Sequence, residues 1–281
     1  MIIKLGVIGY PLGHTLSPVF QQAALDHLKI NGQFKAIPIT PEELPKFIRT
    51  MDKNNIKAVC VTIPHKESVL DLIDEIDPEA LKIGAVNWIV NNEGNLKGFN
   101  TDYKGFLKSL EFETGFSPYK KTATIFGSGG SCKAVSHALN LAGLSKLFII
   151  NRTKKKAENI ANDLKSENLD IIPLDFKDSI INNVLLESEL IINSTSLGMS
   201  GGPEPNNDLI NNYDINPGTI GYDLVYSPKE TPFLKKILEK KGIPASGLSM
   251  LVFQGIEGFK LSTGQDAPEK LMLDITNSIS L

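Results

Sequence analysis

The chain has 281 residues, 41% hydrophobic and 22% charged, which is enough for one large or two ordinary globular domains. Its 29 basic and 32 acidic residues give a net charge of −3, and the absence of a long basic stripe argues against a nucleic-acid partner. No apolar run reaches membrane-spanning length and no signal-peptide block opens the chain, so we expect a cytoplasmic protein with no membrane partner.

Cysteine and histidine usage narrows the chemistry further. The two cysteines, Cys60 and Cys132, lie far apart and have no metal-type neighbours. The four histidines likewise show no ligand spacing. We therefore expect a reducing compartment, no disulfide framework and no metal.

The first third of the chain alternates strand and helix patterns. Strands are predicted at 3–8, 34–39 and 58–63. Helices are predicted at 17–28, 40–51 and 66–76. Ser17 is expected to cap the first helix, with Pro18 in its first turn. This alternation is typical of α/β layering with mainly parallel strands.

A β-hairpin is predicted next. Its arms are residues 85–90 and 96–99, and Asn92-Glu93-Gly94 forms the turn between them. The second arm leads into Asn100-Thr101-Asp102 and then into a helix over 103–114.

A second alternating series begins at Thr122. The strand 122–126, the turn 127–130, the helix 131–141 and the strand 146–150 form a complete βαβ unit. Further strands are predicted at 169–173, 190–193 and 219–222, and the segment 248–281 is helical in pattern.

These patterns predict a two-domain α/β fold. We expect an α/β substrate domain over 1–105 and a Rossmann-type dinucleotide-binding domain over 106–247. The C-terminal helices, 248–281, are expected to pack back on the first domain.

Lys66 and Asp102 are the candidate catalytic residues. Each follows a predicted strand, and open α/β sheets bind ligands at the carboxyl ends of their strands. A lysine and an aspartate beside one hydroxyl can move its proton while a nicotinamide exchanges hydride. The alternative is that both are ordinary solvated surface residues.

The candidate cofactor turn is Gly127-Ser128-Gly129-Gly130-Ser131-Cys132. It fits the dinucleotide fingerprint loosely because Cys132 replaces the third glycine, but a strand precedes it and a helix follows. A glycine turn that serves packing alone is the alternative.

The residues after the next strand indicate which dinucleotide is bound. Asn151-Arg152-Thr153 stands where an NAD enzyme would place an acid for the ribose hydroxyl, and no acid occurs before Glu158. Cationic and hydroxyl donors suit a 2′-phosphate, so NADP is predicted, with Lys156 in support. A lysine run can also be just a solvated helix face.

Near the amino terminus, Thr15 and Ser17 place two hydroxyls at a helix start. Such a site can hold a carboxylate with neutral donors and the helix dipole. The alternative is that Ser17 serves only as an N-cap.

The ordered motifs of the chain resemble those of the shikimate dehydrogenase family. In chain order they are Gly9-Tyr10-Pro11 with His14-Thr15-Leu16-Ser17-Pro18, Cys60–Lys66, Gly84–Trp88, Asn100–Asp102, the glycine turn, Asn151–Thr153, Asn193–Met199, Tyr222–Tyr226 and Gly247–Gln254.

The resemblance implies reversible, NADPH-dependent reduction of 3-dehydroshikimate to shikimate, a step toward aromatic amino acids, by a monomer or homodimer. It implies that Lys66 and Asp102 form the catalytic pair. The substrate-binding residues that it implies are Thr15, Ser17 and Tyr226 for the carboxylate and Thr62, Asn87 and Gln254 for the ring hydroxyls. The implied cofactor-binding residues are Gly127, Gly129, Gly130, Asn151, Arg152, Thr153, Lys156, Leu224, Gly247 and Met250. Met250 could equally be plain core.

Three departures from the family pattern bear on substrate range. Cys60 replaces an asparagine, Trp88 a threonine and Thr15 a serine. Two alternatives therefore stay open: a quinate/shikimate dehydrogenase with broader cofactor use, and a non-catalytic paralogue that binds a metabolite. The lack of an acid at 151–153 counts against the first, and the retained Lys66 and Asp102 count against the second.

Overall fold

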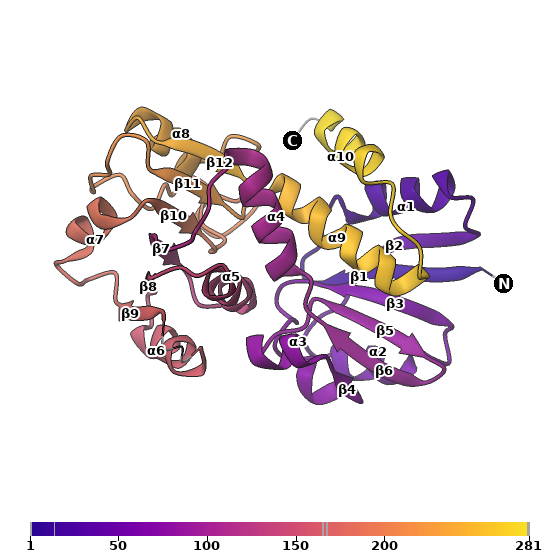
Figure 1. Cartoon of the computed structure of the whole chain (residues 1–281). Coiled ribbons are helices and arrows are strands. Elements are labelled where there is room, and N and C mark those ends of the chain that lie inside the picture. The colour runs from indigo at the N-terminus through magenta and orange to yellow at the C-terminus, as the bar shows by residue number, and fades with distance from the viewer. Residues whose placement is uncertain (1, 14, 165, 167, 280–281) are drawn as a thin grey trace. The chain divides into compact units, whose positions relative to one another are not determined.

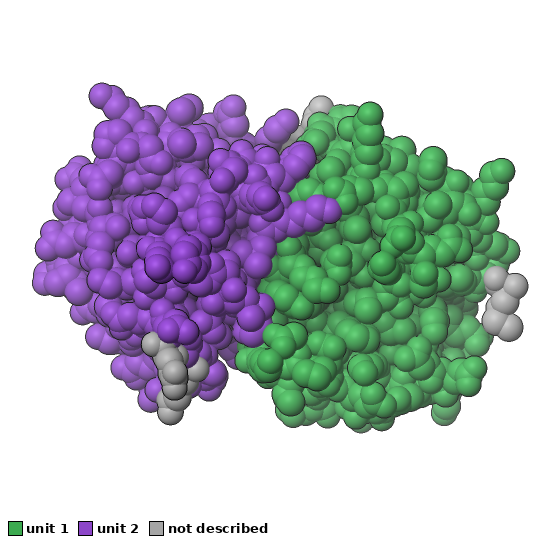
Figure 2. Space-filling model, viewed as in Figure 1, with its two compact units in different colours: residues 1–105, 251–280 green, residues 106–250, 281 purple. Residues whose placement is uncertain are grey.

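The structure of this chain is a computed structural model that describes residues 2–13, 15–164, 166 and 168–279. His14, part of the opening motif, lies outside the described residues. The chain divides into two compact units, coloured separately in Figure 2. The first unit comprises Met1–Gly105 and Leu251–Ser280, and the second unit comprises mainly Phe106–Met250.

The first unit is built on a six-stranded sheet of order β2-β1-β3-β5-β6-β4 (Figure 1). Its strands are β1 (Ile3–Gly9), β2 (Gly32–Pro38), β3 (Ile56–Val61), β4 (Glu75–Ile76), β5 (Trp88–Asn92) and β6 (Asn95–Phe99). Among the described strands of this sheet, β5 alone runs antiparallel to its neighbours. The carboxyl ends of β1, β3 and β6 therefore share one edge, where β5 begins.

Helices cover this sheet and include the returning C-terminal segment. They are α1 (Ser17–His27), α2 (Leu44–Thr50), α3 (Pro78–Ile83), the start of α4 (Asp102–Thr114), most of α9 (Leu248–Thr263) and α10 (Glu269–Ser278). One core cluster joins α2 to β1, β3 and β5 through buried residues such as Leu44, Ile8, Val59 and Ile89. Helix α10 packs along α1 (Figure 1), so residues from the two ends of the chain stabilise the same unit.

The predicted hairpin is present, and its turn has the expected backbone. Glu93 and Gly94 both have positive φ, 55° and 94°, which matches the right-handed twist of the two strands.

The helix predicted over 66–76 is wrong. The structure has a short 3-10 turn at Leu70–Leu72 and then β4, which pairs with β6. The Asp74 amide donates to the Leu96 carbonyl at 3.0 Å, and the Leu96 amide donates to the Asp74 carboxylate at 2.7 Å. These contacts between distant residues override the local helical periodicity.

Three helix starts also differ from expectation. Helix α2, predicted from residue 40, begins at Leu44 with Glu43 as its N-cap. Leu16, not Ser17, occupies the N-cap of α1, and Ser17 is the first helical residue, with no capping bond from a side chain. Helix α3 was not predicted, although Asp77 caps it by accepting from the Glu79 amide at 3.0 Å and Pro78 follows in the first turn. Both signals are visible in the sequence.

The second unit contains an all-parallel sheet of order β12-β11-β10-β7-β8-β9. Its strands are β7 (Thr122–Phe126), β8 (Lys146–Ile150), β9 (Asp170–Leu174), β10 (Leu190–Asn193), β11 (Ile220–Asp223) and β12 (Ile243–Ser246). Its helices include α5 (Gly130–Leu141), α6 (Lys154–Asp163), α7 (Ile181–Glu187) and α8 (Pro232–Glu239). This strand order is that of a Rossmann fold, with the topological switch point between β7 and β10.

The predicted fold class is confirmed by the two α/β sheets and by the C-terminal helices of the first unit. Strand β12 was not predicted, since four residues that include Pro244 carry little strand signal. No helix in the described part of the chain is long and apolar enough to cross a membrane.

Candidate active site

Lys66 and Asp102 meet at the shared edge of the first sheet. The Lys66 ammonium donates to Asp102 Oδ2 at 2.5 Å, and the two side chains are only 13% and 5% exposed. An ion pair this sheltered differs from the solvated surface pairs that the sequence left as an alternative.

The backbone around Lys66 is held by neighbouring segments. The Val86 amide donates to the Lys66 carbonyl at 2.8 Å, which joins the end of β3 to the start of the hairpin. The His65 amide donates to the Thr62 carbonyl at 2.9 Å, and the buried His65 ring lies 2.6 Å from the Ile39 carbonyl oxygen. The loop that presents Lys66 is therefore fixed on both sides of the residue.

Asn87 links Asp102 to the C-terminal helix α9. Its Nδ2 donates to Asp102 Oδ1 at 2.9 Å, and the same nitrogen lies 2.8 Å from Thr101 Oγ1 and 3.1 Å from Gln254 Oε1. Its Oδ1 accepts from the Thr101 amide at 2.6 Å. We call Lys66, Asp102, Asn87, Thr101 and Gln254 the amide–carboxylate cluster.

Four members of this cluster are almost fully buried; only Lys66 is more exposed. Thr101, which the sequence analysis did not single out, joins it because it precedes Asp102 in the motif. Burial raises the pKa of the nearby Cys60 thiol to about 12, with Lys66 lowering it and Asp102 raising it. Cys60 is therefore a neutral thiol and not a nucleophile in this site.

The expected carboxylate-binding residues lie on separate segments. Ser17 is 3% exposed at the start of α1, and Thr15 just before it is half-buried. A Cβ on Gly9 would lie 2.5 Å from Thr62 Cγ2 and 2.8 Å from the Ile63 carbonyl, so the Gly9 loop packs directly on the Thr62 loop. No hydrogen bond within the described residues ties Thr15, Ser17 or Thr62 to the cluster.

Tyr226 belongs to the second unit, in the segment after β11, and is half-buried. Gln254, by contrast, belongs to the first unit although it lies 28 positions further along the chain.

The glycine turn follows β7 at the switch point of the second sheet. Gly127 has a φ of 117°, and a Cβ there would lie 2.5 Å from Ser194 Oγ. The Ser194 hydroxyl donates to the Phe126 carbonyl at 2.6 Å, so the loop after β10 fits against the turn. Ser194 lies in the Asn193–Met199 motif, and the sequence alone predicted no role for it.

Beyond Gly127 the turn opens onto the start of α5. Gly129 is the N-cap of α5, and a Cβ there would meet nothing within 4 Å. Cys132 Sγ lies 3.2 Å from the Gly127 carbonyl, so the thiol fills the place of the third glycine and braces the turn. The open backbone at a helix N-terminus fits a pyrophosphate.

The segment after β8 offers exposed cations. Arg152, Thr153 and Lys156 are all exposed, and Asn151 Nδ2 donates to the Thr153 carbonyl at 2.9 Å, which fixes the turn. Lys154 and Lys155 pair with Asp178 and Glu158 at 3.5 and 3.4 Å. Arg152 and Lys156 form no ion pair with any described residue. Their charges suit a 2′-phosphate, so this donor set fits NADP.

Two of the remaining expected cofactor residues, Leu224 and Gly247, lie at the ends of β10 and β11. The Leu224 amide donates to the Asn193 carbonyl at 2.9 Å. A Cβ on Gly247 would lie 2.6 Å from the Asp223 carbonyl, so only glycine fits there. Met250, in α9, is 7% exposed, as core packing would also require.

Asp223 is a buried acid that the sequence analysis did not single out by itself. Its carboxylate accepts from Asn193 Nδ2 and the Val225 amide, each at 2.9 Å, and from Thr231 Oγ1 at 2.5 Å. Burial raises its pKa to about 7, and these three hydrogen bonds oppose that rise. Thr231 also caps α8 by accepting from the Leu234 amide at 3.2 Å. Asp223 thereby joins β10, β11 and α8.

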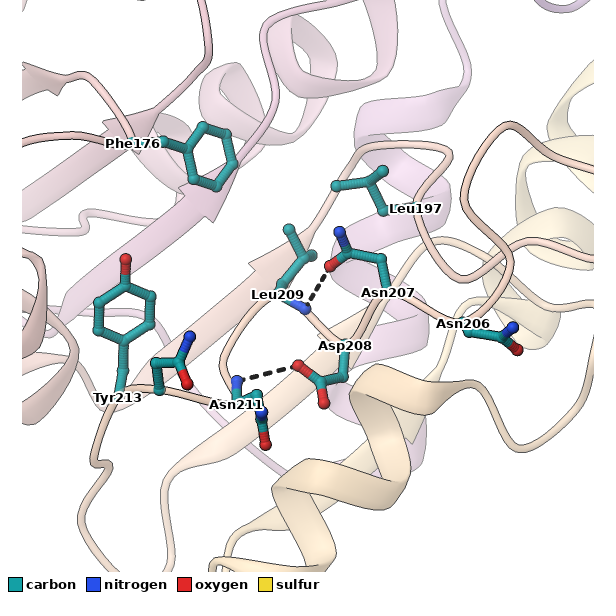
Figure 3. Close-up of a pocket in the computed structure, with 9 residues that line it drawn as sticks. Phe176, Leu197, Asn206, Asn207, Asp208, Leu209, Asn211 and Tyr213 are labelled. Atoms are coloured by element: carbon teal, nitrogen blue, oxygen red, sulfur yellow. Dashed lines mark hydrogen bonds between the residues drawn. The ribbon is translucent and has the colours of Figure 1, made fainter.

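A shallow depression of about 390 Å³ lies elsewhere in the second unit (Figure 3). Its described lining contains none of the expected site residues. Two of its polar side chains hold their own loop: Asn207 Oδ1 accepts from the Leu209 amide and Asp208 Oδ1 from the Asn211 amide, each at 2.9 Å. The dashed lines in Figure 3 mark these bonds. We therefore attribute the depression to the way this loop folds and assign it no ligand.

Comparison with known proteins identifies the family. Residues 7–89 match the model of the shikimate dehydrogenase substrate binding domain, and residues 111–199 match that of shikimate / quinate 5-dehydrogenase. The chain belongs to the shikimate dehydrogenase family. Shikimate dehydrogenase (NADP(+)) of Desulforamulus reducens is 35% identical, over 96% of this chain and 93% of that protein.

Solved structures of family members are similar to this chain over nearly its full length. Shikimate 5-dehydrogenase of Listeria monocytogenes, in complex with shikimate and NAD, has a TM-score of 0.86 at 28% identity, covering 97% of this chain and 96% of that one. The Thermus thermophilus enzyme, in complex with NADP(H) and shikimate, has a TM-score of 0.81 at 33% identity, covering 98% of both chains. The family resemblance inferred from the motifs is thus confirmed.

Proposed function

We propose that this chain catalyses the reversible, NADPH-dependent reduction of 3-dehydroshikimate to shikimate, with Lys66 and Asp102 as its catalytic pair. The observation that carries the proposal is the sheltered 2.5 Å contact between these side chains inside the amide–carboxylate cluster. A proton donor held in one place by its partner is what carbonyl reduction needs at the substrate oxygen.

Lys66 supplies the proton in the direction of reduction. Its ammonium, which donates to Asp102 in the structure, is the proton donor to the carbonyl oxygen as that oxygen becomes a hydroxyl. NADPH, when bound, supplies the hydride. Asp102 keeps Nζ in place and compensates its charge, and in the reverse direction Lys66 takes the hydroxyl proton back.

The substrate is held by neutral donors and acceptors. We assign Thr15, Ser17 and Tyr226 to its carboxylate and Thr62, Asn87 and Gln254 to its ring hydroxyls. The fixed Asn87–Gln254 contact supports the second group, because paired amides leave defined hydrogen-bonding directions for a hydroxyl. A site that pairs each hydroxyl rejects analogues lacking one.

The cofactor is assigned to the second unit. The backbone of Gly127, Gly129 and Gly130 would hold the pyrophosphate at the start of α5. The 2′-phosphate would lie against Asn151, Arg152, Thr153 and Lys156. Met250 would lie toward the nicotinamide, and Leu224 and Gly247 would also contact the cofactor. The missing acid supports NADP over NAD, as do the charges of Arg152 and Lys156, which form no ion pair with a described residue.

The test compares shikimate and quinate as substrates, each with NADP and with NAD, by the formation of reduced cofactor. We expect the highest kcat/KM for shikimate with NADP. A comparable rate with quinate and NAD would favour the broader quinate/shikimate activity instead. No turnover with any pair, together with measurable shikimate binding, would favour the metabolite-binding paralogue. A cytoplasmic location and a monomeric or dimeric state stay predictions.

A further inference from the structure

Helix α9 presents a row of three residues to the strands of the first unit. Gln254, Gly258 and Ser262 are spaced by four, so they lie on one face of the helix. Gln254 Oε1 lies 3.1 Å from Asn87 Nδ2. Trp88, which follows Asn87 in the chain, contacts the other two residues of the row, Gly258 and Ser262.

Trp88 holds α9 by shape and by a hydrogen bond. Its Nε1–H donates to Ser262 Oγ at 2.8 Å. A Cβ on Gly258 would lie 2.5 Å from Trp88 Cδ2 and 2.6 Å from Cε2, so the indole ring lies flat on the bare backbone of the helix. The ring is 1% exposed, and the Phe34 ring lies 6.4 Å from it, centroid to centroid.

Other contacts hold α9 independently of Trp88. A Cβ on Gly105 would lie 2.7 Å from the Gln254 amide nitrogen, so α4 approaches α9 closely. Gln21 of α1 donates to the Gly255 carbonyl at 2.8 Å. Altering the indole should therefore shift α9 without detaching it.

We propose that Trp88 is a positioning residue that sets the place of Gln254, and through it the affinity for the ring hydroxyls of the substrate. The proposal rests on the role given to Gln254 above. Asn87 and Trp88 are adjacent in the chain, so one segment both contacts Gln254 and fixes the helix that carries it. The threonine that the family motif has at this position could not reach Ser262 or cover Gly258.

The test is a double-mutant cycle of Trp88→Phe and Gln254→Ala, read as the KM values for shikimate and NADP, kcat and the melting temperature. Trp88→Phe keeps an aromatic ring but removes the Nε1–H donor. We expect it to raise the KM for shikimate roughly three- to tenfold and to leave that for NADP nearly unchanged. Gln254→Ala should raise the KM for shikimate further, and Trp88→Phe should add almost nothing in that background.

Ile89→Ala is the matched control. Ile89 neighbours Trp88 in β5 but points to the opposite face, into the core cluster with β1, β3 and α2. It should lower the melting temperature and leave the KM for shikimate as in the unaltered protein. If Trp88→Phe does not fold, Ser262→Ala carries the test, because it removes the acceptor of the indole bond and leaves the ring in place; the Ser262 hydroxyl bond to the Gly258 carbonyl within α9 is lost with it.

The outcomes separate the two claims. If Trp88→Phe raises the KM for shikimate by the same factor in the Gln254→Ala background as in the unaltered protein, the positioning role of Trp88 is overturned, while the role of Gln254 stands. An unchanged KM for shikimate in Gln254→Ala would overturn the role of Gln254 in substrate binding. It would also overturn the proposal that Trp88 acts on the substrate through Gln254. A KM shift in Ile89→Ala equal to that in Trp88→Phe would show that general loosening of the core is responsible.

Discussion

Two buried aspartates, one in each unit, show how the units differ. Asp102 follows β6 in the first unit and accepts from the Lys66 ammonium and the Asn87 amide. Asp223 ends β11 in the second unit and accepts only from neutral groups of the described residues: an amide side chain, a backbone N–H and a hydroxyl.

The partners distinguish a carboxylate suited to proton transfer from one suited to a structural role. A carboxylate beside an ammonium belongs to a pair that can hold and release a proton at a substrate. A carboxylate surrounded by neutral donors has its pKa raised by burial, here to about 7, and links strands and a helix. We therefore propose that similar burial at similar strand ends serves two purposes, and that the partner of each carboxylate decides which.

The largest effect is expected from Lys66→Ala. Loss of the proposed proton donor should lower kcat by roughly 10²–10⁴-fold, while cofactor binding, which we assign to the second unit, should stay intact. Steady-state kinetics and NADPH titration measure both. Lys104→Ala is the control, because Lys104 forms an exposed pair with Glu257 at 3.1 Å. A kcat near that of the unaltered protein would remove Lys66 from the catalytic role.

Asp102→Asn tests whether the pair acts as a unit. The amide keeps the shape but removes the charge that compensates Lys66, so kcat should again fall by roughly 10²-fold or more. The double variant with Lys66→Ala should lose much less than the two single losses combined. Kinetics of all three variants measure the coupling, and simple additivity would contradict it.

Asp223 should make stability depend on pH. Its pKa is about 7 when folded and near 3.8 when unfolded, so its contribution is full below about pH 4 and lost as pH rises through about 7. From pH 5 to 8 the free energy of unfolding should fall by about 2 kcal/mol more than in Asp223→Asn. Urea unfolding of both proteins at the two pH values measures this. Parallel pH profiles would show that Asp223 does not titrate in this range.

Arg152→Ala should separate the two dinucleotides. Loss of a charge-assisted contact with the 2′-phosphate should raise the KM for NADP about tenfold and barely change that for NAD. Lys154→Ala is the control on the same segment, since its ammonium already lies 3.5 Å from Asp178. Equal losses with both cofactors would show that Arg152 acts through the fold.

The smallest effect is expected at Thr15. Its hydroxyl suits the carboxylate, but its methyl group narrows the space that the extra hydroxyl of quinate needs. We expect the unaltered protein to prefer shikimate and Thr15→Ser to accept quinate at least as well, since one methyl is worth about 1–3 kcal/mol. kcat/KM for both acids measures the change. A preference of the unaltered protein for quinate would contradict the reasoning.

The sequence alone determined the features that depend on near neighbours. The hairpin turn Asn92-Glu93-Gly94, the βαβ unit around Gly127 and the strand ends before Lys66 and Asp102 all carry their signals within a few residues. The order of the motifs along the chain likewise identified the family. Such signals survive because turn backbones and strand periodicity depend on the local chain.

Only the tertiary structure decided what distant segments do together. Residues 66–76 follow a helical pattern, yet they form a short 3-10 turn and then a two-residue strand, Glu75–Ile76, that pairs with β6, because long-range hydrogen bonds outweigh local propensity. The burial of Asp223 among neutral donors and the packing of Trp88 on Gly258 likewise join residues that are far apart in sequence. A sequence pattern predicts which face of a helix is buried. Only the packed structure shows which other segment that face contacts.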